Sequence, residues 1–111
     1  MIKIVMSQAA SALLRALIGR AHVAHDRILL TDVESVDWRS MTFNGERHQI
    51  QLRIPAPDAR EIVDRMCRNL EDAEFSIPGI IVADIAVLGT PTRRPDGSIS
   101  LSIEALTIAS D

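Results

Sequence analysis

Residues 80–108 read IIVADIAVLGTPTRRPDGSISLSIEALTI, and the rest of the predicted fold depends on this segment. Residues 80–88 are almost entirely apolar, and residues 99–105 alternate between apolar and polar side chains. Both patterns are typical of β-strands. Residues 89–97 between them hold two glycines and two prolines, which indicate a loop. We therefore expect a β-hairpin.

The pairing within this hairpin can be predicted from its faces, because a shift of one residue would exchange them. Asp84 opposite Glu104 places apolar residues of both strands on the opposite, inner face. Like charges across a ladder repel, so we expect Arg47 or Arg53 to lie on the same open face and to compensate both acids. The candidate ligand or partner face is Arg47, Arg53, Asp84 and Glu104.

The same pairing leaves an apolar group at one end of the open face. We expect the helices on the inner face, so water would contact this group unless another chain covers it. A homo-oligomer, and a dimer first of all, is therefore predicted. The alternative is a monomer in which residues 2–6 or the C-terminal residues cover the group. The candidate oligomer interface is Ile80, Val82, Leu106 and Ile108.

Two helices are predicted from apolar residues at helical spacing. The first runs over residues 8–21 with Ser7 as its N-cap, and the second starts after Asp58, three residues before Glu61, and ends near Asp72 or Ala73. Residues 2–6 fit either a short strand or an irregular terminus.

A second hairpin is predicted between the helices. Residues 28–38 form one strand with a bulge near Glu34 or Ser35, and residues 47–54 alternate as the other. Asn44-Gly45 marks the turn. Setting Trp38 opposite Ile50 makes both inner faces apolar.

The fold class is therefore α+β, in one domain over residues 1–111. We expect a duplicated α-β-β unit with a pseudo-two-fold, which gives a two-layer sandwich of two helices on one face of a four-stranded antiparallel sheet. The sheet order along the chain is 1-2-4-3, counted from Ile28. This is a permuted ferredoxin-like arrangement.

The amino-acid composition limits the cellular compartments and the classes of partner that we expect. The chain is 47% hydrophobic and 24% charged with a net charge of −3, which is typical of a soluble globular protein and gives no electrostatic case for nucleic acid or a membrane. Cys67 is the single cysteine, so a reducing, cytoplasmic setting is expected. The first 25 residues lack Asp and Glu, which leaves a mitochondrial presequence as the alternative.

Residues with metal or nucleophile chemistry are few. His22, His25 and Asp26 lie close in sequence but lack the further ligands that zinc needs, and Cys67 lies on the apolar face of a helix as a small hydrophobe. No phosphate loop, dinucleotide motif or nucleophile elbow occurs, so we expect no metal and no cofactor. None of the aromatics Trp38, Phe43 and Phe75 is expected on the outer face of the central strands, where RNA-binding sheets stack bases.

Three functions from different classes follow. The first is a small non-catalytic domain that acts by self-association and by binding protein, because the fold is well specified and catalytic motifs are absent. The second is a small-molecule-binding module or enzyme that uses the open sheet face. The third rests on the order of elements, strand, helix and terminal hairpin, which is similar to that of small phage tail-completion proteins and implies a structural ring. That likeness covers element order alone and no shared motif.

Overall fold

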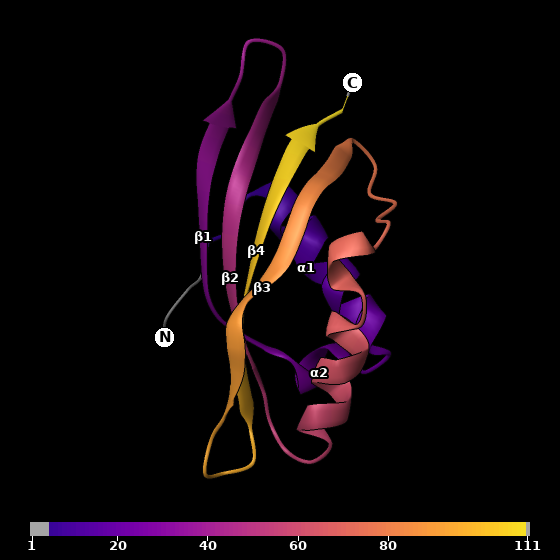
Figure 1. The fold of residues 1–111 in the computed structure, drawn as a ribbon, viewed down its shortest axis with the longest axis vertical. Coiled ribbons are helices and arrows are strands. Elements are labelled where there is room, and N and C mark those ends of the chain that lie inside the picture. The colour runs from indigo at the N-terminus through magenta and orange to yellow at the C-terminus, as the bar shows by residue number, and fades with distance from the viewer. Residues whose placement is uncertain (1–4, 111) are drawn as a thin grey trace.

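Two α-helices and four long strands make up residues 5–110, the part of the chain that the computed structural model describes. The strands form one antiparallel sheet in the predicted order β1-β2-β4-β3, and both helices lie on one of its faces (Figure 1). None of the described helices is long and apolar enough to cross a membrane. In chain order the elements are α1 (Gln8–Ala21), η1 (His25–Arg27), β1 (Leu29–Arg39), β2 (Asn44–Ile54), α2 (Ala59–Cys67), η2 (Leu70–Asp72), β3 (Ile80–Arg93) and β4 (Ile99–Ala109).

Helix α1 confirms the prediction for residues 8–21. The Ser7 hydroxyl accepts a hydrogen bond from the Ala10 N–H at 3.1 Å, which satisfies one of the free amides of the first turn. The helix ends at His22, whose left-handed backbone lets its N–H reach the Gly19 carbonyl. Val5 and Met6 belong to no strand, and the rest of the predicted short strand lies outside the described residues.

The core lies between the helices and the inner face of the sheet. Alternate residues of β2 and β4 point toward the helices, as the period of two requires, and they meet the apolar stripes of α1 and α2. Strand residues in this layer are His48, Ile50, Leu52, Ile54, Ile99, Leu101, Ile103, Ala105 and Thr107, and helix residues are Ala10, Leu13, Leu17, Ile18, Ala21, Ala59, Ile62, Val63 and Met66.

The final hairpin is longer than predicted. Strand β3 continues to Arg93, so residues 89–93, expected in the loop, belong to the strand, and Thr92 and Arg93 pair with Ser100 and Ile99. Proline is tolerated there because β3 is an edge strand, and Gly89 adopts a φ of 64° where the register shifts between Leu88 and Thr92. The turn itself is short, with the Arg94 N–H donating to the Ser98 carbonyl at 2.8 Å.

The predicted register of this hairpin is wrong by two residues in its middle. Asp84 pairs with Leu106 and Glu104 pairs with Ala86, so the two carboxylates are not opposite each other. A shift of two keeps every side chain on its face, which is why the apolar pattern could not detect it. A further shift between Val82 and Asp84 marks a bulge at Ala83.

The first hairpin also differs from its prediction. Trp38 pairs with Gly45 rather than with Ile50, and the bulge lies between Leu30 and Asp32 rather than near Glu34. The turn is at residues 40–43, where the Ser40 N–H donates to the Phe43 carbonyl at 2.9 Å. The Asn44-Gly45 pair therefore begins β2 and is not the turn.

Two arginines join the C-terminal ends of the helices. Helix α2 ends at Cys67, earlier than predicted, and Arg20 of α1 donates to the Met66 carbonyl at 3.0 Å and to the Arg68 carbonyl. Arg65 of α2 donates in turn to the Ala21 carbonyl at 2.8 Å. Each guanidinium thus satisfies carbonyls that a helix end leaves free, and its charge favours the negative end of the helix dipole.

Candidate interface on the open sheet face

An apolar group lies on the sheet face opposite the helices, at the end where the β1–β2 hairpin turns. The register places its members in two adjacent cross-strand rows. Val36 and Ile81 are 56% and 52% exposed, while the other three are partly buried. We call this group the open-face cluster: Val36, Trp38, Ile81, Leu106 and Ile108.

Only part of the predicted interface belongs to this cluster. Leu106 and Ile108 lie on the open face as expected. The bulge at Ala83 turns Val82 and Ile80 to the other side, where Val82 packs against the core and Ile80 lines a cavity beside α1. Ile81 takes their place on the open face. The placement of Ile80 and Val82 is therefore corrected.

Trp38 joins the open face because of the register of the first hairpin. The prediction put Trp38 and Val36 on the inner face, opposite Ile50 and Leu52. In the structure Val36 pairs with Arg47, whose side chain is on the open face, and Trp38 follows two residues later. The sequence signal that could have shown this is the acidic alternation of β1, which places Asp37 toward the helix side.

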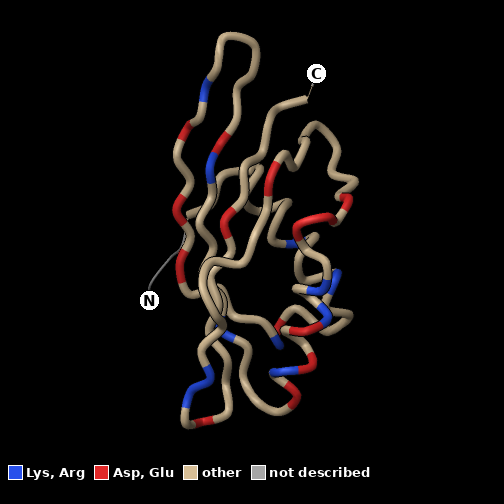
Figure 2. Tube along the Cα trace, viewed as in Figure 1, with Lys and Arg blue, Asp and Glu red and all other residues tan. Residues whose placement is uncertain are grey.

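Charged side chains lie in and beside the cluster, and Arg47 stands between Val36 and Leu106 in one of its rows. Arg47 contacts Glu104 at 3.3 Å, so the predicted compensation of Glu104 is confirmed for this arginine. Asp84 lies in the same row as Arg47 but opposite Leu106, and Arg53 lies three rows away toward the β3–β4 turn. The structure therefore brings together two of the four candidate face residues. Figure 2 shows acidic residues along β1 and basic residues near the β3–β4 turn.

Nothing in the described part of the chain covers the cluster. Both helices lie on the other face, and the C-terminal strand runs within the sheet to Ala109. Val5 is 79% exposed, and the Ser110 N–H donates to the Gly79 carbonyl. The predicted alternative in which C-terminal residues fold over the face is therefore wrong for residues up to Ser110.

A histidine is buried on the helix side of the sheet. His48 has no exposed surface, and its Nδ1 lies 2.7 Å from Ser35 Oγ while its Nε2 lies 2.8 Å from Thr107 Oγ1. A neutral imidazole donates from one nitrogen and accepts at the other, and both hydroxyls can supply either role. Because no substrate can reach a ring without exposed surface, we interpret this chain of groups as structural and not as a nucleophilic site.

Burial lowers the pKa of His48, and the nearby Glu46 carboxylate opposes this effect. In the unfolded chain the imidazole binds its proton near its ordinary pKa of about 6.5, whereas in the folded chain it stays neutral to lower pH. The unfolded state therefore binds more protons below pH ~6.5, and stability falls as the pH falls. We expect a loss of up to about 1.4 kcal/mol per pH unit until the folded imidazole also binds a proton.

Urea unfolding at pH 7.5 and pH 5.5 measures this effect. The wild type and the variant His22→Gln, which removes an exposed histidine, should both lose stability at the lower pH. The variant His48→Gln should lose less. An equal loss in His48→Gln and wild type would contradict the assignment.

The other residues considered as metal ligands or nucleophiles are three exposed polar residues and the cysteine. Within residues 5–110 no cluster of three or more His, Cys, Asp or Glu side chains could hold a metal ion, and His22, His25 and Asp26 are all exposed. Cys67 packs partly against the core, and burial raises the pKa of its thiol despite the nearby Arg20. A raised pKa disfavours the reactive thiolate.

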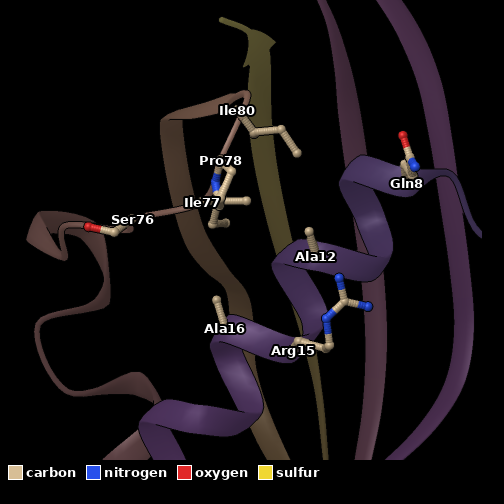
Figure 3. Close-up of a pocket in the computed structure, with 8 residues that line it drawn as sticks. All are labelled: Gln8, Ala12, Arg15, Ala16, Ser76, Ile77, Pro78 and Ile80. Carbon is tan, nitrogen blue, oxygen red and sulfur yellow. The ribbon is translucent and has the colours of Figure 1, made fainter.

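The largest cavity, about 560 Å³, lies between α1 and residues 76–80. Ala12 and Ala16 face Ile77 and Pro78 across it, with Arg15 on its rim (Figure 3). Arg15 donates to the Ser11 hydroxyl at 3.1 Å. The lining holds no acid and no histidine, so it offers no general base.

Searches against models of known protein families and against curated proteins find no match to this chain.

Proposed function

We propose that this chain is a non-catalytic domain that acts by self-association, as a homodimer formed through the open-face cluster. The observation that carries this proposal is the position of Val36, Trp38, Ile81, Leu106 and Ile108 together on a sheet face that none of residues 5–110 covers. Full burial of one large apolar side chain contributes about 1.5–3 kcal/mol. Several such side chains per copy can offset the entropy that association costs.

We favour a second copy of this chain over an unrelated partner whose surface carries charges of a single sign. The open face carries charges of both signs, with Arg47 paired to Glu104 and with Asp84 beyond Leu106 in the row of Arg47. A two-fold axis brings the same face of both copies together, so arginines of one copy can lie near carboxylates of the other. The apolar side chains then contact those of the other copy, and the Arg47–Glu104 pair and Asp84 supply the polar contacts.

The finer fold and location are part of this proposal. The order α1-β1-β2-α2-β3-β4 supports a duplicated α-β-β unit in a permuted ferredoxin-like arrangement. The single cysteine, Cys67, supports a reducing cytoplasmic location. Binding of another protein by the same face is the second role we propose for it.

Light scattering at tens of micromolar tests the dimer. The chain mass is 12.2 kDa, and the wild type should show twice that value. Ile81→Glu and, separately, Val36→Glu place a charge within the cluster, on one edge strand each, and should give the mass of one chain. Both side chains are more than half exposed, so each variant should still fold.

The matched control is Val5→Glu, which makes the same change at an exposed valine outside the cluster and should stay dimeric. A monomeric wild type would contradict the proposal, as would variants at positions 36 and 81 that keep the wild-type mass. A mass of several chains would favour a ring, the structural role implied by the likeness to tail-completion proteins.

A further inference from the structure

A second feature of the open face lies at its other end, beside the β3–β4 turn. A cavity of about 410 Å³ there is lined by residues of all four strands. Two arginines reach it, Arg53 from β2 and Arg94 from the end of β3, together with the hydroxyl-bearing residues Thr92, Ser100 and Ser102. The lining contains no Asp and no Glu. Its charged groups are therefore both positive, and its hydroxyl groups can donate further hydrogen bonds.

Arg53 carries a buried hydrogen-bond donor that residues 5–110 leave unpaired. Its Nε is buried from water and has no hydrogen-bond partner among residues 5–110. An unpaired buried N–H is costly, and in proteins such groups usually have a partner. The ion pair formed in the described part of the chain is Arg47–Glu104, so neither Arg53 nor Arg94 has a carboxylate within 4.0 Å there.

Asp96, in the β3–β4 turn, already accepts hydrogen bonds from another residue. Its Oδ1 accepts hydrogen bonds from the Ser98 N–H at 2.9 Å and from the Ser98 hydroxyl at 2.6 Å. These bonds lower the pKa of the Asp96 carboxyl, with smaller contributions from Arg53 and Arg94. The Asp96 carboxylate is therefore occupied by Ser98, and Figure 2 shows basic residues beside it near the β3–β4 turn.

We propose that this cavity binds the phosphoryl group of a small phosphorylated molecule, with Arg53 and Arg94 as its charged donors. Guanidinium groups bind phosphate oxygens through paired N–H donors, and such charge-assisted bonds are about twice as strong as neutral ones. Donors arrive from β2, from β4 and from the end of β3. Donors on several sides fit a tetrahedral oxyanion better than a planar carboxylate, which a single guanidinium can hold. The cavity is within the size range of small-molecule sites, so the rest of the ligand fits too.

This site is separate from the proposed dimer interface, which uses the open-face cluster and not the whole face of the sheet. Arg53 and Arg94 lie outside the open-face cluster, at the opposite end of the sheet. Phosphate affinity and molecular mass are separate readouts, so failure of one proposal leaves the other standing.

Calorimetric titration with inorganic phosphate, at constant ionic strength set with chloride, tests the site. We expect wild type to bind phosphate, and Arg53→Gln and Arg94→Gln each to bind about tenfold more weakly or worse, because each loses charged hydrogen bonds. Arg94 is exposed at the turn, so its variant keeps the test valid if Arg53→Gln folds poorly. Circular dichroism checks the fold of both.

The matched control is Arg93→Gln. Arg93 neighbours Arg94 and its loss changes the net charge equally, but it lines a different cavity with Arg60, Asp64 and Ile99. It should bind phosphate as wild type does. Equal affinity in all four proteins, or no binding by wild type, would overturn the proposal. Acetate binding as tightly as phosphate would overturn the phosphoryl assignment in favour of a carboxylate.

Discussion

Gly45→Ala is expected to lower the free energy of unfolding by about 3 kcal/mol, at the upper end of what overpacking usually costs. A Cβ at this position would lie 2.1 Å from the Thr107 carbonyl oxygen and 3.3 Å from the Ile108 Cα. Both atoms are backbone of β4, which pairs with β2 along its whole length. The added methyl can be accommodated only if the two central strands separate locally.

Gly19→Ala is the matched control. A Cβ at position 19 would meet nothing within 4 Å, and the residue lies in α1. Alanine favours a helix over glycine by up to ~1 kcal/mol, so this variant should be slightly more stable than wild type. Urea unfolding of both variants gives the comparison. A Gly45→Ala variant as stable as wild type would show that the β2–β4 contact is looser than described.

His48→Ala is expected to cost about 3 kcal/mol of unfolding free energy, because it leaves a cavity and removes two hydrogen bonds at once. Thr107 is 2% exposed, so its hydroxyl would lose its partner away from water. Ser35 is less buried and can turn to water. The loss therefore comes mainly from the centre of the sheet.

Ser35→Ala separates the two contributions. It removes one hydrogen bond to His48 without opening a large cavity, and should cost about 1 kcal/mol. The two variants are compared by urea unfolding at pH 7.5, where the His48 imidazole is neutral. Equal losses in both variants would show that the hydrogen bond to Thr107 and the packing of the ring contribute nothing.

The sequence predicts those parts of the fold that depend only on which side chains share one face of a helix or a hairpin. Helix α1 was predictable because Ser7 and the apolar stripe are local signals. The order β1-β2-β4-β3 was predictable because each hairpin has one apolar face and two helices must cover it. Neither inference needs the register of any strand pair.

Register was less predictable, for reasons visible in particular residues. The pairing of Asp84 was wrong by two because such a shift leaves the apolar pattern unchanged. Gly45 was assigned to a turn because Asn-Gly is a strong turn signal, whereas its glycine serves a close approach to Thr107. That approach involves a strand more than sixty residues later, so no local pattern reports it.

Two of the four residues predicted for the oligomer interface lie on the open face of the sheet. Leu106 and Ile108 follow from the alternation of β4, which has no irregularity. Ile80 and Val82 were misplaced because one bulge at Ala83 reverses all side chains before it. The carbonyl partners of Arg20 and Arg65 on the other helix could not be deduced from spacing alone.

The fluorescence of Trp38 tests the proposed interface most directly. It is the only tryptophan in the chain and belongs to the open-face cluster, so its emission reports on that face alone. We predict that wild type at about 50 µM emits at shorter wavelength than the Ile81→Glu variant, because a second copy removes water from the partly exposed indole. The same emission maximum in both proteins would contradict the account.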